Sequence, residues 1–130
     1  MANFKKHEKL SKHIGAVAGC VIDLFYQFQR ISKNPQAKFD WLELLIYTGG
    51  GAVLSATAGM LPDILEPPVH PHHRKTLHSL TIGAVVVTAI IKATKSNLPK
   101  STKYAITTSG CGFISHLVLD SRTIHGLPII

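Results

Sequence analysis

The stretch from 67 to 79, PPVHPHHRKTLHS, carries four of the chain's 8 histidines together with Arg74 and Lys75. Imidazole nitrogens bind divalent metals, and a guanidinium group binds two phosphate oxygens through its planar fork. The composition of this stretch therefore predicts a metal site or a phosphate site. A solvated loop is the plainer alternative, and we expect that description to fit His70 and His72.

Residues of metal-ligating type also occur at three other places in the chain. His116 and Asp120 lie four residues apart, so both fall on one face of a helix and can bind one metal or bridge two. Asp63 and Glu66 follow an apolar segment, and His13 opens another. Imidazole and carboxylate together suit Zn²⁺, Mn²⁺ or Fe²⁺. The alternatives are a hydrogen-bonded core histidine at 116, a polar helix end at 120 and a surface residue at 13.

Four apolar segments must position these residues. Their approximate ranges are 13–28, 41–61, 77–91 and 104–120. Each is 15 residues or longer, which favours helices over strands. The stretches between them are rich in turn and breaker residues and cover 32–36, 62–72 and 95–101. The pattern predicts a single all-α domain over residues 1–130, folded as a compact four-helix up-and-down bundle.

An up-and-down bundle brings the candidate ligands to one end. The starts of the first and third helices then lie beside the ends of the second and fourth. The residues at those four places are His13, Asp63, His78, His116 and Asp120. We therefore expect five ligand-type side chains around one point, with nitrogen or oxygen atoms ~2.0–2.2 Å from a bound zinc ion.

The composition indicates that the protein is associated with a membrane. The chain is 45% hydrophobic and 16% charged, against about 25% charged in an average soluble domain. Residues 44–62 contain no charge, and this stretch approaches the ~20 residues that span a bilayer. Gly51, Ser55 and Gly59 recur at a spacing that lets helices pack closely in membranes. We expect a membrane-embedded or membrane-associated bundle that contacts lipid; a tightly packed soluble core is the alternative.

The net charge of +7 suits an anionic membrane surface or nucleic acid. The predicted threading puts Lys9 and Lys12 at the opposite end from Lys100 and Lys103, which argues against one continuous basic stripe. No basic run is interleaved with aromatic residues, so we do not expect nucleic acid as a partner. Asp23 interrupts the first apolar run, and we expect no signal peptide.

Three segments match known sequence motifs. Residues 59–80, GMLPDILEPPVHPHHRKTLHSL, resemble G-x-LPD-x-D…HRG-x-THS. Residues 112–130, GFISHLVLDSRTIHGLPII, resemble G-x-x-SH-x-x-LD-x-x-T-x-x-G-x-P-x-x, and residues 12–19, KHIGAVAG, resemble TH-x-x-G. In this order the motifs resemble the YdjM-like family of membrane-bound metal-dependent hydrolases, which is distantly similar to zinc-dependent phospholipase C.

The resemblance implies a metal-binding set in this chain. Its members are His13, Asp63, His73, His78, His116 and Asp120. It also implies a location in the bacterial inner membrane. The sequence departs from the family's pattern at Leu65, which replaces the second acid, and at Lys75 and Leu77 in the HRG-x-THS motif. We expect Leu65 to point away from the site and Glu66 to be near if it replaces the missing acid.

Together the residues and the resemblance predict a membrane-associated metal-dependent hydrolase. We expect it to act on a phosphoester or a lipid head group through a water activated by zinc, or by manganese or iron. The expected catalytic residues are Asp63, Arg74 and His78, with Arg74 orienting phosphate. The alternative is a non-catalytic membrane protein whose metal site is structural or vestigial, and which binds lipid or a protein partner. An open coordination position would distinguish the two.

Overall fold

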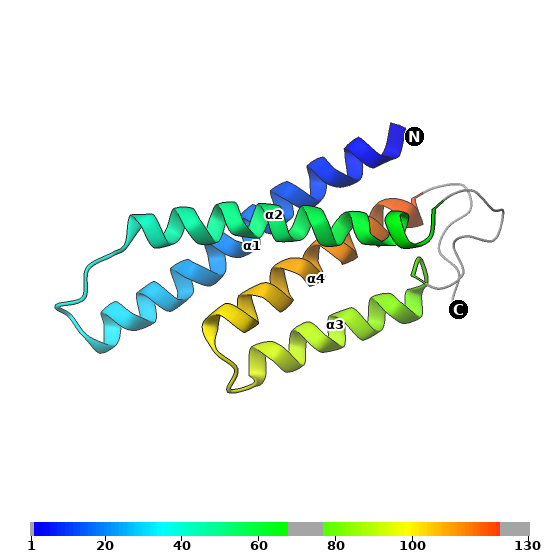
Figure 1. Ribbon diagram of the computed structural model, residues 1–130. Helices are drawn as coiled ribbons and strands as arrows, with labels where there is room; N and C mark the ends of the chain where they lie inside the picture. Colours follow the sequence, from blue (N-terminus) through cyan, green and yellow to red (C-terminus); the bar gives the residue numbers. More distant parts are fainter. Residues whose placement is uncertain (1, 68–76, 123–130) are drawn as a thin grey trace.

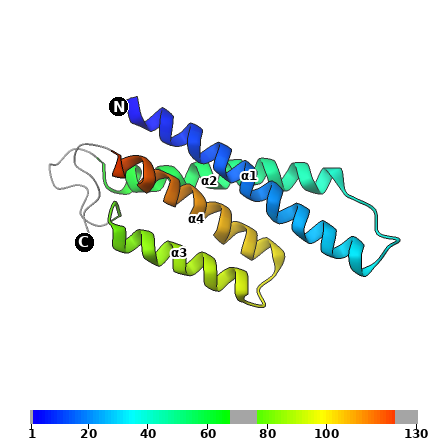
Figure 2. The ribbon, with the colours of Figure 1, turned by 180° about the vertical axis from the view of Figure 1, so that it is seen from behind.

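A computed structural model describes residues 2–67 and 77–122, and four helices make up nearly all of this part (Figure 1). They are α1 (Ala2–Lys33), α2 (Trp41–Leu65), α3 (Leu80–Lys95) and α4 (Lys100–Ser121). No strand occurs in the described residues. Successive helices run in opposite directions, as Figures 1 and 2 show. The all-α prediction and the up-and-down order are therefore confirmed.

Short polar residues set the starts of two helices. The Asp40 carboxylate accepts a hydrogen bond from the backbone N–H of Glu43 at 2.9 Å and caps α2. The Ser79 hydroxyl accepts one from the backbone N–H of Ile82 at 3.3 Å and caps α3. Such caps satisfy N–H groups that the first turn of a helix leaves unpaired. The Ser79 cap also leaves His78 outside the helix, immediately before it.

α1 and α2 extend beyond their predicted ends in places that bear on the candidate site. α1 begins at Ala2 rather than near His13, because its polar first turns are helical as well. α2 continues through the buried Pro62 to Leu65, although proline usually ends a helix. The predicted break after Leu61 is therefore wrong, and Asp63 lies in the last turn of α2 rather than in a loop.

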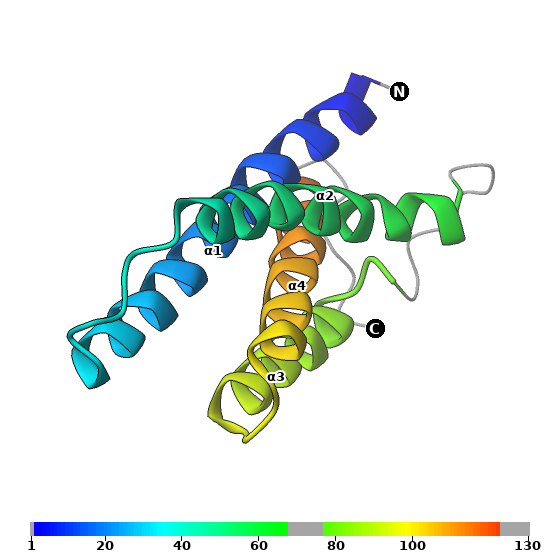
Figure 3. The same cartoon turned by 60° about the vertical axis from the view of Figure 1, so that its left-hand side comes forward.

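Three of the helices pack against one another, and the fourth is peripheral. α1, α2 and α4 are in mutual contact, whereas α3 contacts α4 alone among the described helices. Figures 2 and 3 show α3 alongside α4 and away from α1. The four described helices thus form a bundle in which α1, α2 and α4 pack together and α3 lies on one side.

Glycines permit the close crossing of α1, α2 and α4. A Cβ atom added to Gly15 would lie 2.1 Å from the carbonyl oxygen of Gly51, and one added to Gly112 would lie 2.1 Å from that of Ser55. No side chain fits at such distances, so glycine is required at both crossings. The close helix packing predicted from the small-residue spacing is present in the fold.

Polar side chains lie inside this assembly and large apolar ones outside. The buried polar residues include Ser11, Asp23, Gln27 and Thr108, whereas most buried apolar residues are alanines. Large apolar side chains are exposed along α1 and α2. Among them are Val17, Val21, Phe25, Phe28, Leu42, Leu45, Ile46 and Val53. α2 is the single described helix that is long and apolar enough to cross a membrane.

Candidate metal centre

The ligand-type residues meet at one end of the helical assembly. The start of α1, the ends of α2 and α4, and the segment before α3 all lie at this end in Figures 1 and 2. Asp63 comes from the last turn of α2, His78 from the segment before α3, and His116 and Asp120 from the last turns of α4. These four members of the predicted set are brought together as the threading predicted.

Four side-chain atoms converge on one small volume. His116 Nε2 lies 3.1 Å from His78 Nε2, 3.3 Å from Asp120 Oδ2 and 3.6 Å from Asp63 Oδ1. His78 Nε2 lies 3.2 Å from Asp63 Oδ1 and 3.5 Å from Asp120 Oδ2. Two imidazole nitrogens and two carboxylate oxygens therefore face one another, and both histidines and Asp120 are almost completely buried.

These separations fit a divalent metal ion. In a tetrahedral zinc site with ligand bonds of about 2.0–2.1 Å, neighbouring ligand atoms lie roughly 3.3 Å apart. Of the six separations among the four atoms, the five that involve a histidine nitrogen range from 3.1 to 3.6 Å. Two histidine nitrogens and two carboxylate oxygens also form a donor set that suits zinc. The centre formed by Asp63, His78, His116 and Asp120, called the metal centre below, therefore passes this test of fit.

Glu66 contacts His78 on the side that faces away from the metal centre. Its Oε2 atom lies 3.2 Å from His78 Nδ1, the nitrogen that faces away from the metal centre. Both oxygens of Glu66 also accept a hydrogen bond from the backbone N–H of Leu77 at 3.1 Å. A carboxylate that fixes the outer nitrogen of a histidine is a common arrangement around bound metals. Glu66 is thus near, but it contacts the outer side of His78; Leu65 is 64% exposed, in line with the expectation that it points away.

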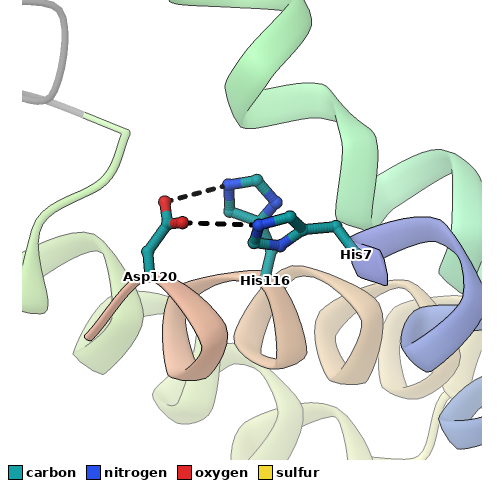
Figure 4. Close-up of side chains that lie close together, drawn as sticks. All are labelled: His7, His116 and Asp120. Atoms are coloured by element: carbon teal, nitrogen blue, oxygen red, sulfur yellow. Dashed lines mark ion pairs between the residues drawn. The ribbon is translucent and has the colours of Figure 1, made fainter. Parts of the chain in front are cut away.

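His7 of α1 adds a third imidazole to the site. Its Nε2 atom lies 3.4 Å from Asp120 Oδ1, and its ring centroid lies 4.2 Å from that of His116. In Figure 4 both imidazoles face the Asp120 carboxylate, one toward each oxygen. The Nδ1 atoms of His7 and His116 are buried and have no hydrogen-bond partner among the described residues. Among the three imidazoles of the site, a partner for the outer nitrogen is therefore described for His78 alone.

The surroundings shift the protonation of two histidines in opposite directions. Burial lowers the pKa of His78, but hydrogen bonds with Asp63 and Glu66 outweigh burial, so this pKa lies above its ordinary value. Burial and the neighbouring His116 lower the pKa of His7, and the attraction of Asp120 does not offset them. His7 therefore favours the neutral form, which can donate a lone pair to a metal ion.

The prediction for His13 is wrong. This residue is exposed on α1, and its Nδ1 atom lies 2.6 Å from the carbonyl oxygen of Lys9. Among the described residues, two groups have ligand atoms within 4.8 Å of one another, and His13 belongs to neither; the groups are His7, His116 and Asp120, and Asp63, His78 and His116. His7 lies six residues earlier on the same helix, which is more than one and a half turns away. The first helix therefore does supply a histidine to the site, but not the expected one.

The sequence contains a pattern from which the place of His7 in the site could have been predicted. His7, Ser11, Gly15, Gly19, Asp23 and Gln27 follow one another at intervals of four residues, and all are buried. Every member of this row is small or polar. Extending the glycine spacing backwards from Gly15 would have led to Ser11 and His7, whereas His13 lies off the row. The predictions for His73 and Arg74 concern positions outside the described residues.

Comparisons with protein-family models, curated proteins and solved structures found no match to this chain.

Proposed function

We propose that this protein is a membrane-associated metal-dependent hydrolase that acts on a phosphoester or a lipid head group. The observation that carries the proposal is the convergence of His78 Nε2, His116 Nε2, and one oxygen each of Asp63 and Asp120, at separations of 3.1–3.6 Å. Imidazole nitrogens and carboxylate oxygens that converge in this way are the donor set that binds divalent metal ions.

In this proposal each residue of the site has its own role. The four converging side chains would hold a divalent ion, most suitably zinc, with manganese or iron as the other fitting ions. When bound, the ion would supply Lewis-acid activation of a water molecule. Glu66 orients His78 through its outer nitrogen, and His7 holds the second oxygen of Asp120. The phosphate-orienting role of Arg74 rests on the sequence, because Arg74 lies outside the described residues.

The metal centre is most accessible to solvent at Asp63. The Asp63 side chain is 30% exposed, while those of His78, His116 and Asp120 are at most 4% exposed. A substrate would therefore approach past Asp63. The resemblance of residues 59–80 and 112–130 to membrane-bound metal-dependent hydrolases agrees with this use of the site.

The distribution of apolar side chains supports a membrane location. α1 exposes Val17, Val21 and Phe25 by more than half, and its one acid in this region, Asp23, is buried. A soluble surface does not present such rows of large apolar side chains, since patches of this kind mark contact with lipid or another protein. We propose the bacterial inner membrane as the location, with the metal centre near one membrane face.

The pair His7 and His13 offers the sharpest test of the proposed site. We expect His7→Ala to lower zinc-dependent hydrolysis of a phosphoester by at least about ten-fold, a loss of the size seen when a group that orients metal ligands is removed. His13→Ala is the matched control and should hydrolyse the ester at the wild-type rate. Equal rates for the two variants, or no zinc-dependent hydrolysis of soluble or lipid phosphoesters by the wild type, would contradict the proposal.

A second function is favoured by one observation. Four side chains already surround the centre, and a closed four-ligand site is typical of structural zinc. In that case the protein would be a non-catalytic membrane protein that binds lipid or a protein partner. Cobalt substitution separates the two functions, because added phosphate should change the visible spectrum of an open site and leave that of a closed site unchanged.

A further inference from the structure

An apolar groove runs along α1 on the side where α4 packs. Its larger part has a volume of about 510 Å³ and is lined by α1 residues such as Val17 and Val21 and by Thr107 of α4. A second part of about 240 Å³ shares Val21 and Thr107 and adds Phe25 and Lys103. Because the two parts share lining residues, they form one continuous groove.

The groove has the length of a lipid chain. Its α1 wall extends from His13 to Tyr26, which is about 20 Å at 1.5 Å per residue. One leaflet contributes roughly half of the ~30 Å hydrocarbon core of a bilayer. The groove is therefore long enough for one complete acyl chain, and its lining offers almost no polar surface to an occupant.

A cation marks one end of the groove. The ammonium group of Lys103 donates a hydrogen bond to the carbonyl oxygen of Thr94, at 3.3 Å, and no carboxylate partner is found for it among the described residues. Lys100 lies one turn away and is paired with two carboxylates. A lysine that lacks a described carboxylate partner and lies beside an apolar groove is complementary to a phosphate attached to an acyl chain.

We propose that this groove binds one anionic phospholipid, with an acyl chain along Val17, Val21 and Phe25 and the phosphate at Lys103. The lipid lies on the side of α1 that carries His13, and its phosphate lies at the end of the molecule opposite the metal centre. The proposal rests on the membrane placement proposed above and is independent of hydrolysis.

The test uses the full-length protein in nanodiscs of equal parts phosphatidylglycerol and phosphatidylcholine. After extraction into mild detergent, the lipid retained per chain is counted by native mass spectrometry. Wild type should retain one phosphatidylglycerol molecule in preference to phosphatidylcholine. Lys103→Gln should still retain lipid but with a preference lowered by about five-fold, since one lysine contributes about that factor at an anionic surface.

Filling the groove should remove the lipid altogether. Val21→Trp and Val17→Trp place an indole in the groove at positions that are 57% and 63% exposed, so neither disturbs the core. The matched control is Val53→Trp, at a position on α2 that is 65% exposed and outside the groove lining. Lys38→Gln is the control for charge, because Lys38 is exposed and does not line the groove.

The outcomes separate the groove from the proposed function. Lipid retention by both groove variants at the level of Val53→Trp would overturn the proposal, as would an equal preference for phosphatidylglycerol in Lys103→Gln and wild type. Zinc content and membrane partitioning are measured on the same samples. Wild type that stays soluble without detergent would instead contradict the membrane placement, and absence of zinc would contradict the metal centre.

Discussion

The two ends of the molecule pair their charged and ionisable groups in different ways. At the end opposite the metal centre, Lys100 Nζ lies 2.5 Å from Asp23 Oδ1 and 2.6 Å from Glu43 Oε1. Arg30 lies 3.0 Å from the other oxygen of Glu43. These four residues, called the Lys100 cluster, contain two cations and two carboxylates. Gln27 completes it by donating a hydrogen bond to Asp23 at 2.6 Å.

The metal centre is built from a different set of groups. The carboxylate of Asp63 faces the imidazoles of His78 and His116, and imidazoles can remain neutral and offer lone pairs. The Lys100 cluster is balanced by its own side chains and joins α1, α2 and α4. Burial of polar groups alone therefore does not identify a ligand site in this protein; the convergence of lone-pair donors on one point does.

Removing the ammonium group of Lys100 should have the largest effect on stability. Lys100→Met leaves the fully buried Asp23 without its ammonium partner, and we expect a loss of about 3 kcal/mol in the free energy of unfolding. Thermal unfolding in detergent measures it, with Lys38→Met as the control on an exposed lysine. The zinc content of Lys100→Met should remain that of wild type. A stable Lys100→Met variant that has lost zinc would reverse the roles assigned to the two ends.

Zinc should stabilise the protein through the metal centre alone. At a free zinc concentration of 100 times Kd, binding to the folded state contributes about 2.7 kcal/mol. We expect this increment in wild type and in Lys100→Met, and none in His78→Ala. Unfolding with and without zinc checks it. An increment in wild type that disappears in Lys100→Met would show that the two ends are coupled.

The same substitution at each end should affect zinc binding differently. Glu66→Gln removes the charge that orients His78, so we expect zinc affinity to fall by about 10–100-fold. Glu43→Gln is the matched control in the Lys100 cluster and should leave the affinity unchanged. Competition with a chelating dye measures both. Unchanged affinity in Glu66→Gln would remove Glu66 from the support of the metal centre.

The sequence predicted the helices better than their ends. Trp41 was correctly placed at the start of α2, because the apolar segment begins there, and the structure shows Asp40 as the cap directly before it. The end of α2 was missed because Pro62 is tolerated inside this helix. Near the N-terminus, the pattern of apolar residues did not predict that the first turns of α1 are helical. The buried face there is polar, so hydrophobic periodicity follows the exposed side.

The part of the candidate site that lies within one helix was predicted correctly, because the spacing of its residues determines which face they share. His116 and Asp120 share a face of α4 whatever the rest of the fold does, and the threading then brought Asp63 and His78 to them. His13 was chosen over His7 because the apolar segment was taken to begin at residue 13. The Lys100 cluster was not predicted, since it joins Asp23 and Lys100, which are 77 residues apart in the chain.

Metal analysis of three purified proteins tests the metal centre most directly. Wild type, His116→Ala and Lys100→Met are each loaded with zinc, freed of excess metal by desalting, and measured by mass spectrometry of the elements. We predict at least stoichiometric zinc in wild type and Lys100→Met, and none above background in His116→Ala. Zinc in His116→Ala at the wild-type level, or none in wild type, would contradict the proposed metal centre.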